Sequence, residues 1–168
     1  MNGQTMTGRS RTVLVVAVDL SDESEDLLST ARELVRPVDD AELHVVHVVR
    51  PEPLRERLAD PVVSLHTNER VLVESAQWVL LRWCESVMVG SRARWVVHTP
   101  VGDPVTEVTR VAREVGAHII AVAAHDGRRR RLFHRSVLAR IARSAPCSVL
   151  TIRDRRKAAQ VQATMPAP

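Results

Sequence analysis

The chain has 168 residues, of which 45% are apolar and 26% charged, and this length suits one domain with its own buried core. Aromatic residues make up only 2%, which argues against a nucleic-acid binder that stacks bases on aromatic side chains. The formal charge of +4 is carried almost entirely by arginine, since Lys157 is the only lysine. A catalytic lysine is therefore not expected.

Simple sequence features also bear on compartment and redox state. No run of uncharged apolar residues is long enough for a transmembrane helix. The first residues, MNGQTMTGRSR, lack the apolar segment of a secretory signal. Cys84 and Cys147 form no CxxC motif and indicate no disulfide framework. We expect a cytoplasmic protein with free thiols and no membrane partner.

The N-terminal part predicts a strand followed by a helix. Residues 1–11 are polar and aperiodic and are expected to be disordered. The apolar run Thr12–Val18 is typical of a strand that is buried on both faces of a parallel sheet. Ser21 and Asp22 can cap a helix, and Glu25 would complete a capping box with Asp22. The expected buried face of this helix repeats with helical spacing at Leu27, Leu28, Ala31, Leu34 and Val35.

The next segment predicts a second strand, a helix and a third strand. Glu42–Val49 is the second strand, and the proline-containing stretch from Arg50 to Val63 is a loop or lid. Asn68 can cap a long helix, and Arg94–Thr99 is the third strand. The residues of this helix expected to face inward are Val71, Leu72, Ala76, Val79, Leu80 and Trp83.

The C-terminal part continues the alternation. Asp103 and Pro104 are typical of a cap and first position of a helix. His118–Ala124 is the fourth strand, Ser136–Ser144 a short helix and Ser148–Arg153 the fifth strand. Four residues of the two central strands are expected to be nearly inaccessible: Val15, Val16, Ile120 and Val122.

This order predicts a single α/β domain over residues 12–153, with a parallel sheet and helices on both faces, and a disordered basic and polar tail over residues 154–168. Ligands of such folds bind at the carboxyl ends of the strands, so Asp19 and the stretch from Ala124 are the places to search. His44 and His47 lie three apart on a strand and should point to opposite faces, so no metal site is expected. No nucleophile or P-loop motif is present, so no catalytic residue is assigned.

Five segments in order resemble the universal stress protein family: Val13–Ser21, His47–Val49, Val101–Pro104, Gly116–Val122 and Ala145–Leu150. The resemblance covers Thr12–Arg153, and it implies a three-layer sandwich with sheet order 3-2-1-4-5. It also implies a stress-response protein that is usually dimeric and in many members binds ATP.

In nucleotide-binding members of that family, residues matching Asp19 and Val48 meet the adenosine. Their phosphate loop reads G-x-x-G, nine residues, then G-[ST], because glycines let backbone amides approach phosphates at a helix N-terminus. Here Ala124 replaces the first glycine and Gly127 matches the second, but only seven residues, 128–134, follow.

The end of the loop also departs from the pattern. Arg135 replaces the third glycine, whereas Ser136 keeps the hydroxyl and Val137 follows it. The loop thus looks nearer the family branch that is shortened and glycine-poor. Its arginine run, Arg128–Arg131, could clamp phosphate through guanidinium groups, or it could be an ordinary solvated loop.

Two functional hypotheses follow. The first is a non-enzymatic, dimeric interaction or regulatory module of the stress response, with an unidentified protein partner and no cofactor. The alternative is a nucleotide-binding regulator that takes ATP with Mg²⁺ through Asp19, Gly127, Ser136 and the Arg128–Arg131 loop, and this alternative leaves slow ATP hydrolysis open. Binding to nucleic acid is not expected, because aromatic platforms and recognised motifs are lacking.

The fifth strand predicts how the chain associates. It ends the sheet in the order that the resemblance implies, so one of its sides is open. An unguarded edge tends to pair with a second copy about a two-fold axis. The resemblance implies the same homodimer, with Val149, Leu150, Thr151 and Ile152 at the interface.

Overall fold

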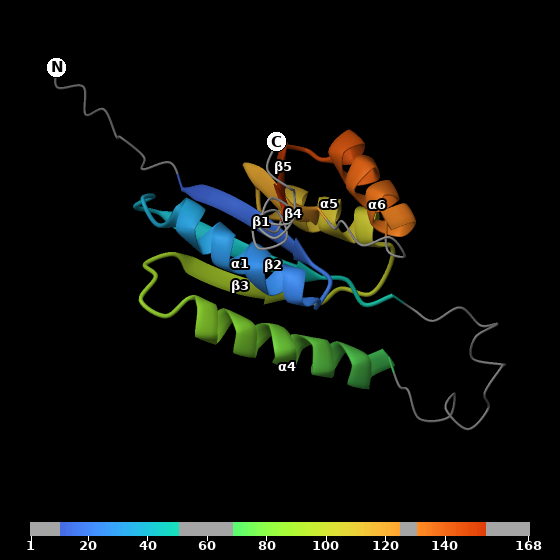
Figure 1. Ribbon diagram of the computed structural model, residues 1–168, viewed down its shortest axis with the longest axis horizontal. Coiled ribbons are helices and arrows are strands. Elements are labelled where there is room, and N and C mark those ends of the chain that lie inside the picture. Colours follow the sequence, from blue (N-terminus) through green and yellow to red (C-terminus); the bar gives the residue numbers. More distant parts are fainter. Residues whose placement is uncertain (1–10, 51–68, 125–130, 154–168) are drawn as a thin grey trace, which may run out of the picture.

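The computed structural model describes residues 11–50, 69–124 and 131–153, and it forms one five-stranded parallel sheet with helices on both faces (Figure 1). The strand order is β3-β2-β1-β4-β5. All four neighbouring pairs are parallel, so the predicted fold class and strand order are confirmed. The strands are β1 (Thr12–Val18), β2 (Ala41–His47), β3 (Arg94–His98), β4 (Ile119–Ala124) and β5 (Ser148–Arg153). The helices are α1 (Asp22–Val35), α4 (Glu69–Val87), α5 (Pro104–Glu114) and α6 (Arg131–Ser144).

Several predicted boundaries need correction. The strand β2 ends at His47 rather than at Val49, because its partner β1 ends at Val18 directly opposite. Val49 instead makes an isolated parallel bridge to Val101. The helix α6 begins at Arg131, five residues earlier than expected, since arginine and leucine in the preceding stretch are good helix formers. The capping residue Asn68 and the loop from residue 51 lie outside the described residues.

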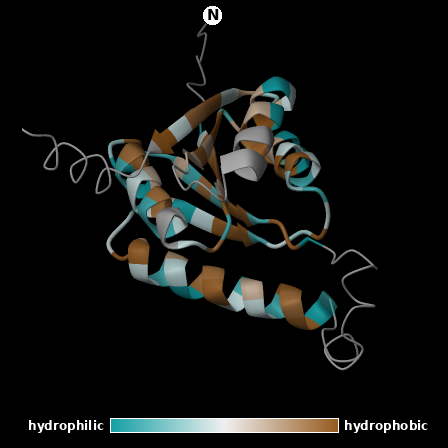
Figure 2. Ribbon diagram, turned by 45° about the vertical axis from the view of Figure 1, so that its right-hand side comes forward, coloured by the Kyte–Doolittle hydropathy of each residue, from teal (hydrophilic) through white to brown (hydrophobic). Residues whose placement is uncertain are grey.

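One face of the sheet packs against α1 and α4. Figure 2 shows the strands as largely hydrophobic, and α4 as a helix with alternating hydrophobic and hydrophilic patches. The prediction that Leu34 and Val71 face inward is wrong, because these residues are 46% and 51% exposed. Apolar residues at helical spacing cover a stripe wider than the sheet contacts, so the outermost members stay in solvent. The core on this face includes Leu14, Val16, Leu27, Leu28, Leu43, Val45, Leu80 and Cys84.

The opposite face packs against α5 and α6, and its core includes Val15, Ile120, Val108 and Ile141. The predicted start of α5 is confirmed, because Asp103 caps it by accepting a hydrogen bond from the Thr106 N–H at 3.1 Å. Gly116 ends the helix with φ of +64°, a conformation that favours glycine. Of the four central residues, Val15, Val16 and Ile120 are buried, but Val122 is only partly buried.

Candidate functional site

A cavity of about 390 Å³ opens on the face covered by α5 and α6, where β1, β2 and β4 end. This is the point where the strand order reverses between β1 and β4, the place where open α/β sheets bind ligands. The cavity lies within the range of roughly 300–1,000 Å³ that is typical of small-molecule sites. Its walls are mostly apolar, and Val122 is partly exposed because it lines this space.

Asp19 follows β1 and is the centre of a compact polar cluster at one side of the cavity. Its Oδ1 accepts hydrogen bonds from the Ser21 N–H at 3.2 Å, from the Ser21 hydroxyl, and from the Ser24 hydroxyl at 2.7 Å. The Ser24 Oγ in turn accepts from the Asp19 N–H at 2.9 Å. Leu20, with φ of +59°, turns the chain back so that Ser21 can reach the carboxylate. Ser21, rather than Asp22 of the expected capping box, therefore stands at the N-cap of α1, and its side chain does not cap the helix.

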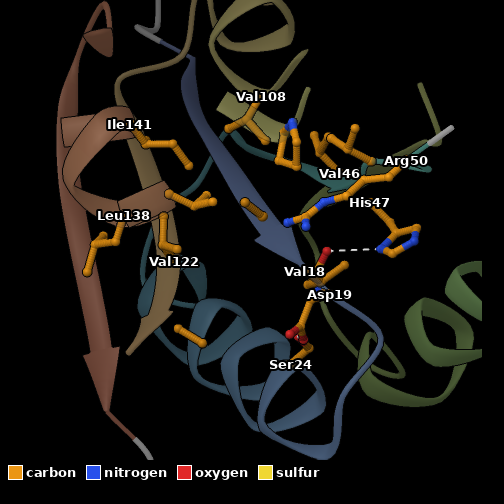
Figure 3. A pocket seen from close by; sticks show the side chains of 15 residues that line it. Val18, Asp19, Ser24, Val46, His47, Arg50, Val108, Val122, Leu138 and Ile141 are labelled. Atoms are coloured by element: carbon orange, nitrogen blue, oxygen red, sulfur yellow. Dashed lines mark hydrogen bonds between the residues drawn. The ribbon is translucent and has the colours of Figure 1, made fainter. Parts of the chain in front are cut away.

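His47, at the end of β2, is hydrogen-bonded to the end of the neighbouring strand β1. Its Nδ1 donates a hydrogen bond to the Val18 carbonyl at 3.1 Å (Figure 3). Burial lowers the pKa of His47 below its ordinary value, although the Val18 carbonyl and the Asp19 carboxylate oppose that effect. A neutral ring with its hydrogen on Nδ1 fits this contact.

Arg50 brings a positive charge to the cavity. It stands two residues beyond Val48, past the end of β2, and both residues line the cavity. Figure 3 shows its guanidinium group directed from the end of β2 towards the end of β1. The same charge contributes to the lowered pKa of His47. A guanidinium at this position can pair with an anionic group of a ligand.

The structure brings together three of the predicted site residues: Asp19, Val48 and Val137 all line the cavity. Ala124 ends β4 beside the lining residue Ala123 but does not itself line the cavity. Ser136 lies in the first half of α6, in a stretch whose side chains are not described. Gly127, Arg128 and most of the arginine run lie outside the described residues.

Sequence reasoning missed several lining residues. Ser24 lies inside the predicted helix, so no sequence signal marks its hydroxyl, which donates a hydrogen bond back to Asp19. Arg50 falls in the predicted loop, although it lies just past the carboxyl end of a strand, where such folds bind ligands. Leu138 and Ile141 of α6 also form part of the cavity wall, and no local pattern in the sequence marks them as such.

Among the described residues there is neither a candidate metal site nor a membrane-spanning helix. No group of three or more histidine, cysteine or acidic residues there could hold a metal ion. None of the helices that the structure describes is both long enough and apolar enough to cross a bilayer.

A sequence profile of the universal stress protein family matches residues 11–153, which is most of the chain. The chain belongs to this family. The fold agrees with solved structures that include a universal stress protein in complex with cAMP. That protein has 19% identity and a TM-score of 0.61, and the match covers 86% of this chain and 98% of the other.

Two further family structures have the same fold. The universal stress protein from Archaeoglobus fulgidus in complex with dAMP has 23% identity and a TM-score of 0.58, over 85% of this chain and 98% of the other. A family protein from Burkholderia pseudomallei has 25% identity and a TM-score of 0.60, over 84% and 95% of the two chains.

Proposed function

We propose that this universal stress protein is a non-enzymatic regulator that binds an adenine nucleoside or nucleoside monophosphate in the cavity at the carboxyl ends of β1, β2 and β4. One observation carries the proposal: an apolar cavity at the switch point of the sheet has a carboxylate, Asp19, on one wall and a guanidinium, Arg50, on another. This favours the nucleotide-binding hypothesis over a module without a ligand.

The apolar part of the cavity suits a flat heterocycle. Val46 and Val48 come from β2, and Val108 and Ile141 come from the helices on the other side. A base between these walls loses water on both faces, which is the main source of affinity in small-molecule sites. Asp19 lies where the family resemblance implies contact with the adenosine, and a carboxylate there accepts hydrogen bonds from sugar hydroxyls.

Arg50 supports a ligand with one phosphate. A guanidinium binds phosphate through paired, charge-assisted hydrogen bonds. The glycine loop that would cradle a longer phosphate chain has lost two of its three glycines, at Ala124 and Arg135. The relatives in complex with cAMP and dAMP hold ligands with a single phosphate. We therefore place ATP with Mg²⁺ second to a monophosphate.

The polar cluster supports a role without catalysis. The Ser24 hydroxyl is buried, donates to Asp19 and accepts from the Asp19 backbone, so it is a poor nucleophile. The Asp19 Oδ1 already accepts three hydrogen bonds, which weakens that oxygen as a general base. Binding rather than turnover is the function that such a site serves.

Calorimetric titration of the full chain with AMP and with adenosine tests the proposal. We expect AMP to bind more tightly than adenosine, because only AMP meets Arg50. Arg50→Gln should weaken AMP binding by about tenfold or more, as for a lost charge-assisted hydrogen bond, and leave adenosine binding nearly unchanged. Arg36→Gln is the matched control, since it removes the same charge from an exposed side chain at the end of α1.

Two results would overturn the proposal. If neither AMP nor adenosine binds at millimolar concentration, the cavity is not an adenine site. If Arg50→Gln and Arg36→Gln weaken AMP equally, the effect is one of net charge and the cavity cation has no specific role.

A dimer through β5 is the second part of the proposed function. In the described residues β5 pairs with β4 on one side only, so its other side is an open edge. Thr151 is exposed there, whereas Val149, Leu150 and Ile152 are partly buried. A second copy pairing with this edge would extend the sheet and cover those side chains.

Thr151→Pro tests this dimer, because proline cannot donate to a strand ladder. We expect the variant to shift from dimer to monomer in light scattering, with its far-ultraviolet circular dichroism unchanged. An unchanged dimer would show that β5 is not the interface. If the variant loses its circular dichroism signal, an intermolecular crosslink between β5 residues in the unaltered protein decides the question.

A further inference from the structure

Two histidines from different strands face each other on the side of the sheet that carries the cavity. The Nδ1 of His44 in β2 lies 2.9 Å from the Nε2 of His98 in β3. His44 is only 5% exposed, whereas His98 is half-buried. Next to His98 in the register stands Val46, which lines the cavity.

The two rings share one hydrogen. Imidazoles whose nitrogens point directly at each other at hydrogen-bond distance have ring centroids about 5 Å apart, and the observed separation is 5.1 Å. The line between the nitrogens therefore holds one N–H and one lone pair. A pair with both rings protonated would place two N–H groups against each other, which breaks the contact.

A neighbouring carboxylate bears on which ring donates. The other nitrogen of His44, Nε2, is buried and lies 3.1 Å from Glu42 Oε1. Glu42 Oε2 pairs with the Arg11 guanidinium at 2.7 Å. A carboxylate favours a hydrogen on the nitrogen that faces it, and this favours the tautomer of His44 with its hydrogen on Nε2 and His98 as the donor to His44.

Other charges around the pair come from β3, from the turn before β2 and from α5. Arg94 lies 3.1 Å from Asp40 and 3.9 Å from Glu42. On α5, Arg110 pairs with Glu107 and Glu114. Burial lowers the pKa of His44 against the opposing effect of Glu42. Burial, then His44, then Arg110 lower the pKa of His98, and Glu114 opposes them.

The end of β3 leads directly to the cavity wall. Just beyond His98, the Pro100 carbonyl accepts a hydrogen bond from the Val49 N–H at 2.9 Å, and the Gly102 N–H donates to the Val49 carbonyl at 3.0 Å. Val49 stands between Val48 and Arg50, and both of these line the cavity. The position of this wall therefore depends on the segment that His98 anchors.

We propose that the His44–His98 pair is an acid-sensitive latch: protonation of both rings breaks its hydrogen bond, loosens the pairing of Val49 with Pro100 and Gly102, and weakens ligand binding in the cavity. The open pair binds more protons than the closed pair, so acid drives opening. The ligand part of this inference rests on the proposed function, whereas the latch itself does not.

The experiment measures two things on the full chain between about pH 7.5 and about pH 5. The first is hydrogen exchange at the Val49 and Gly102 amides, expressed as protection so that the intrinsic pH dependence is removed. The second is the affinity for adenosine, an uncharged probe whose binding does not respond directly to the charge of a protonated ring. We expect protection at both amides to fall with acid, and adenosine affinity to fall by about tenfold.

His98→Gln removes the titrating ring and keeps an amide donor towards His44. In this variant both pH effects should shrink at least threefold. His118→Asn is the matched control, because it removes an exposed histidine while keeping an acceptor for the Val13 N–H. The control should respond to acid as the unaltered chain does. If His98→Gln does not fold, the titration of the His44 and His98 ring signals by nuclear magnetic resonance replaces it, and both should titrate below the ordinary histidine value.

Each outcome decides the proposal. Protection that is independent of pH, or equally dependent in His98→Gln, would overturn the latch, as would ring signals that titrate at or above the ordinary histidine value. Protection that responds while adenosine affinity does not would overturn the coupling to the cavity. Failure of adenosine to bind at about pH 7.5 counts against the proposed function, and with it against the ligand part of the latch, while the exchange data still decide the latch itself.

Discussion

The two faces of the sheet differ in how completely helices cover them. On the α1 and α4 face, large side chains such as Leu28, Leu43 and Leu80 have no exposed area. On the α5 and α6 face, Ile120 is equally buried, but Val122 opens into the cavity and Val96 of β3 is 40% exposed. The second face is therefore a core over β1, β2 and β4 that is open at the cavity and over β3.

Helix length explains much of this difference. The helix α4 has 19 residues and packs along β2 and β3, whereas α5 has only 11. Figure 1 shows α4 running along the β3 flank while α5 and α6 lie over the β4 and β5 end. Both proposed functional features, the cavity and the histidine pair, lie on the less covered face. The closed face provides stability, and the open face has room for a ligand and for titrating groups.

The largest expected effect is a loss of stability on the closed face. Leu80→Ala should lower the free energy of unfolding by about 2–5 kcal/mol, because it leaves a cavity in a packed core. The same substitution at Leu138, which lines the cavity and is partly exposed, should cost less than about 1 kcal/mol. Urea denaturation of both variants measures the difference.

Equal losses for the two leucine variants would contradict the comparison. A large loss at Leu138 would mean that the cavity wall is as tightly packed as the closed face. A small loss at Leu80 would mean that α4 contributes little to the stability of the domain.

The second expected effect is a fall of stability in acid. The pKa values of His44, His47 and His98 are lowered in the folded chain, mainly by burial. The unfolded chain then binds more protons than the folded one below the ordinary histidine pKa of 6.5. This contribution is fully present above that value and is lost as the pH falls from it through the lower pKa values of the folded chain.

Urea denaturation midpoints measured from about pH 8 to about pH 5 should show this decline. The double variant His44→Gln/His98→Gln should flatten the curve, since it removes two of the three groups. His118→Asn should leave the slope unchanged. A slope that survives in the double variant would move the pH sensitivity away from the open face, to His47 or to carboxylates.

Most of the fold could be predicted from the sequence. The apolar runs at Thr12–Val18 and Ile119–Ala124 could form only buried strands, and the alternation with helices determined that they are parallel. The order of the strands came from the family resemblance rather than from any local signal. Periodicity failed at Leu34 and Val71, because it identifies an apolar stripe but does not tell how wide the contact with the sheet is.

The candidate site was only partly predictable. Asp19 and Val48 could be placed at strand ends, and both line the cavity. The pairing of His44 with His98 joins positions 54 residues apart and depends on the register of β2 and β3, which no local pattern contains. To predict that Arg50 lines the cavity, one must know the direction of its side chain beyond the end of β2. The tertiary structure decides that direction.

The smallest expected effect concerns the start of α5, where the open face begins. Asp103 caps the helix through the Thr106 N–H, and it also pairs with Arg140 of α6 at 3.1 Å. The hydrogen bond from the Thr106 N–H is the largest of the contacts that lower the Asp103 pKa, with Arg140 adding to it. Asp103→Ala should therefore cost about 1 kcal/mol, the usual value of a lost cap.

Asp103→Asn separates the two contacts, because an amide oxygen still caps the helix while the ion pair with Arg140 is lost. Exposed ion pairs contribute little, so this variant should cost only a few tenths of a kcal/mol. Urea denaturation of both variants in low salt and in about 0.5 M salt separates the two contributions, since salt screens the ion pair but hardly affects the cap. If Asp103→Asn costs as much as Asp103→Ala, the ion pair between α5 and α6 holds this edge of the cavity together, and the open face is more rigid than its sparse helical cover indicates.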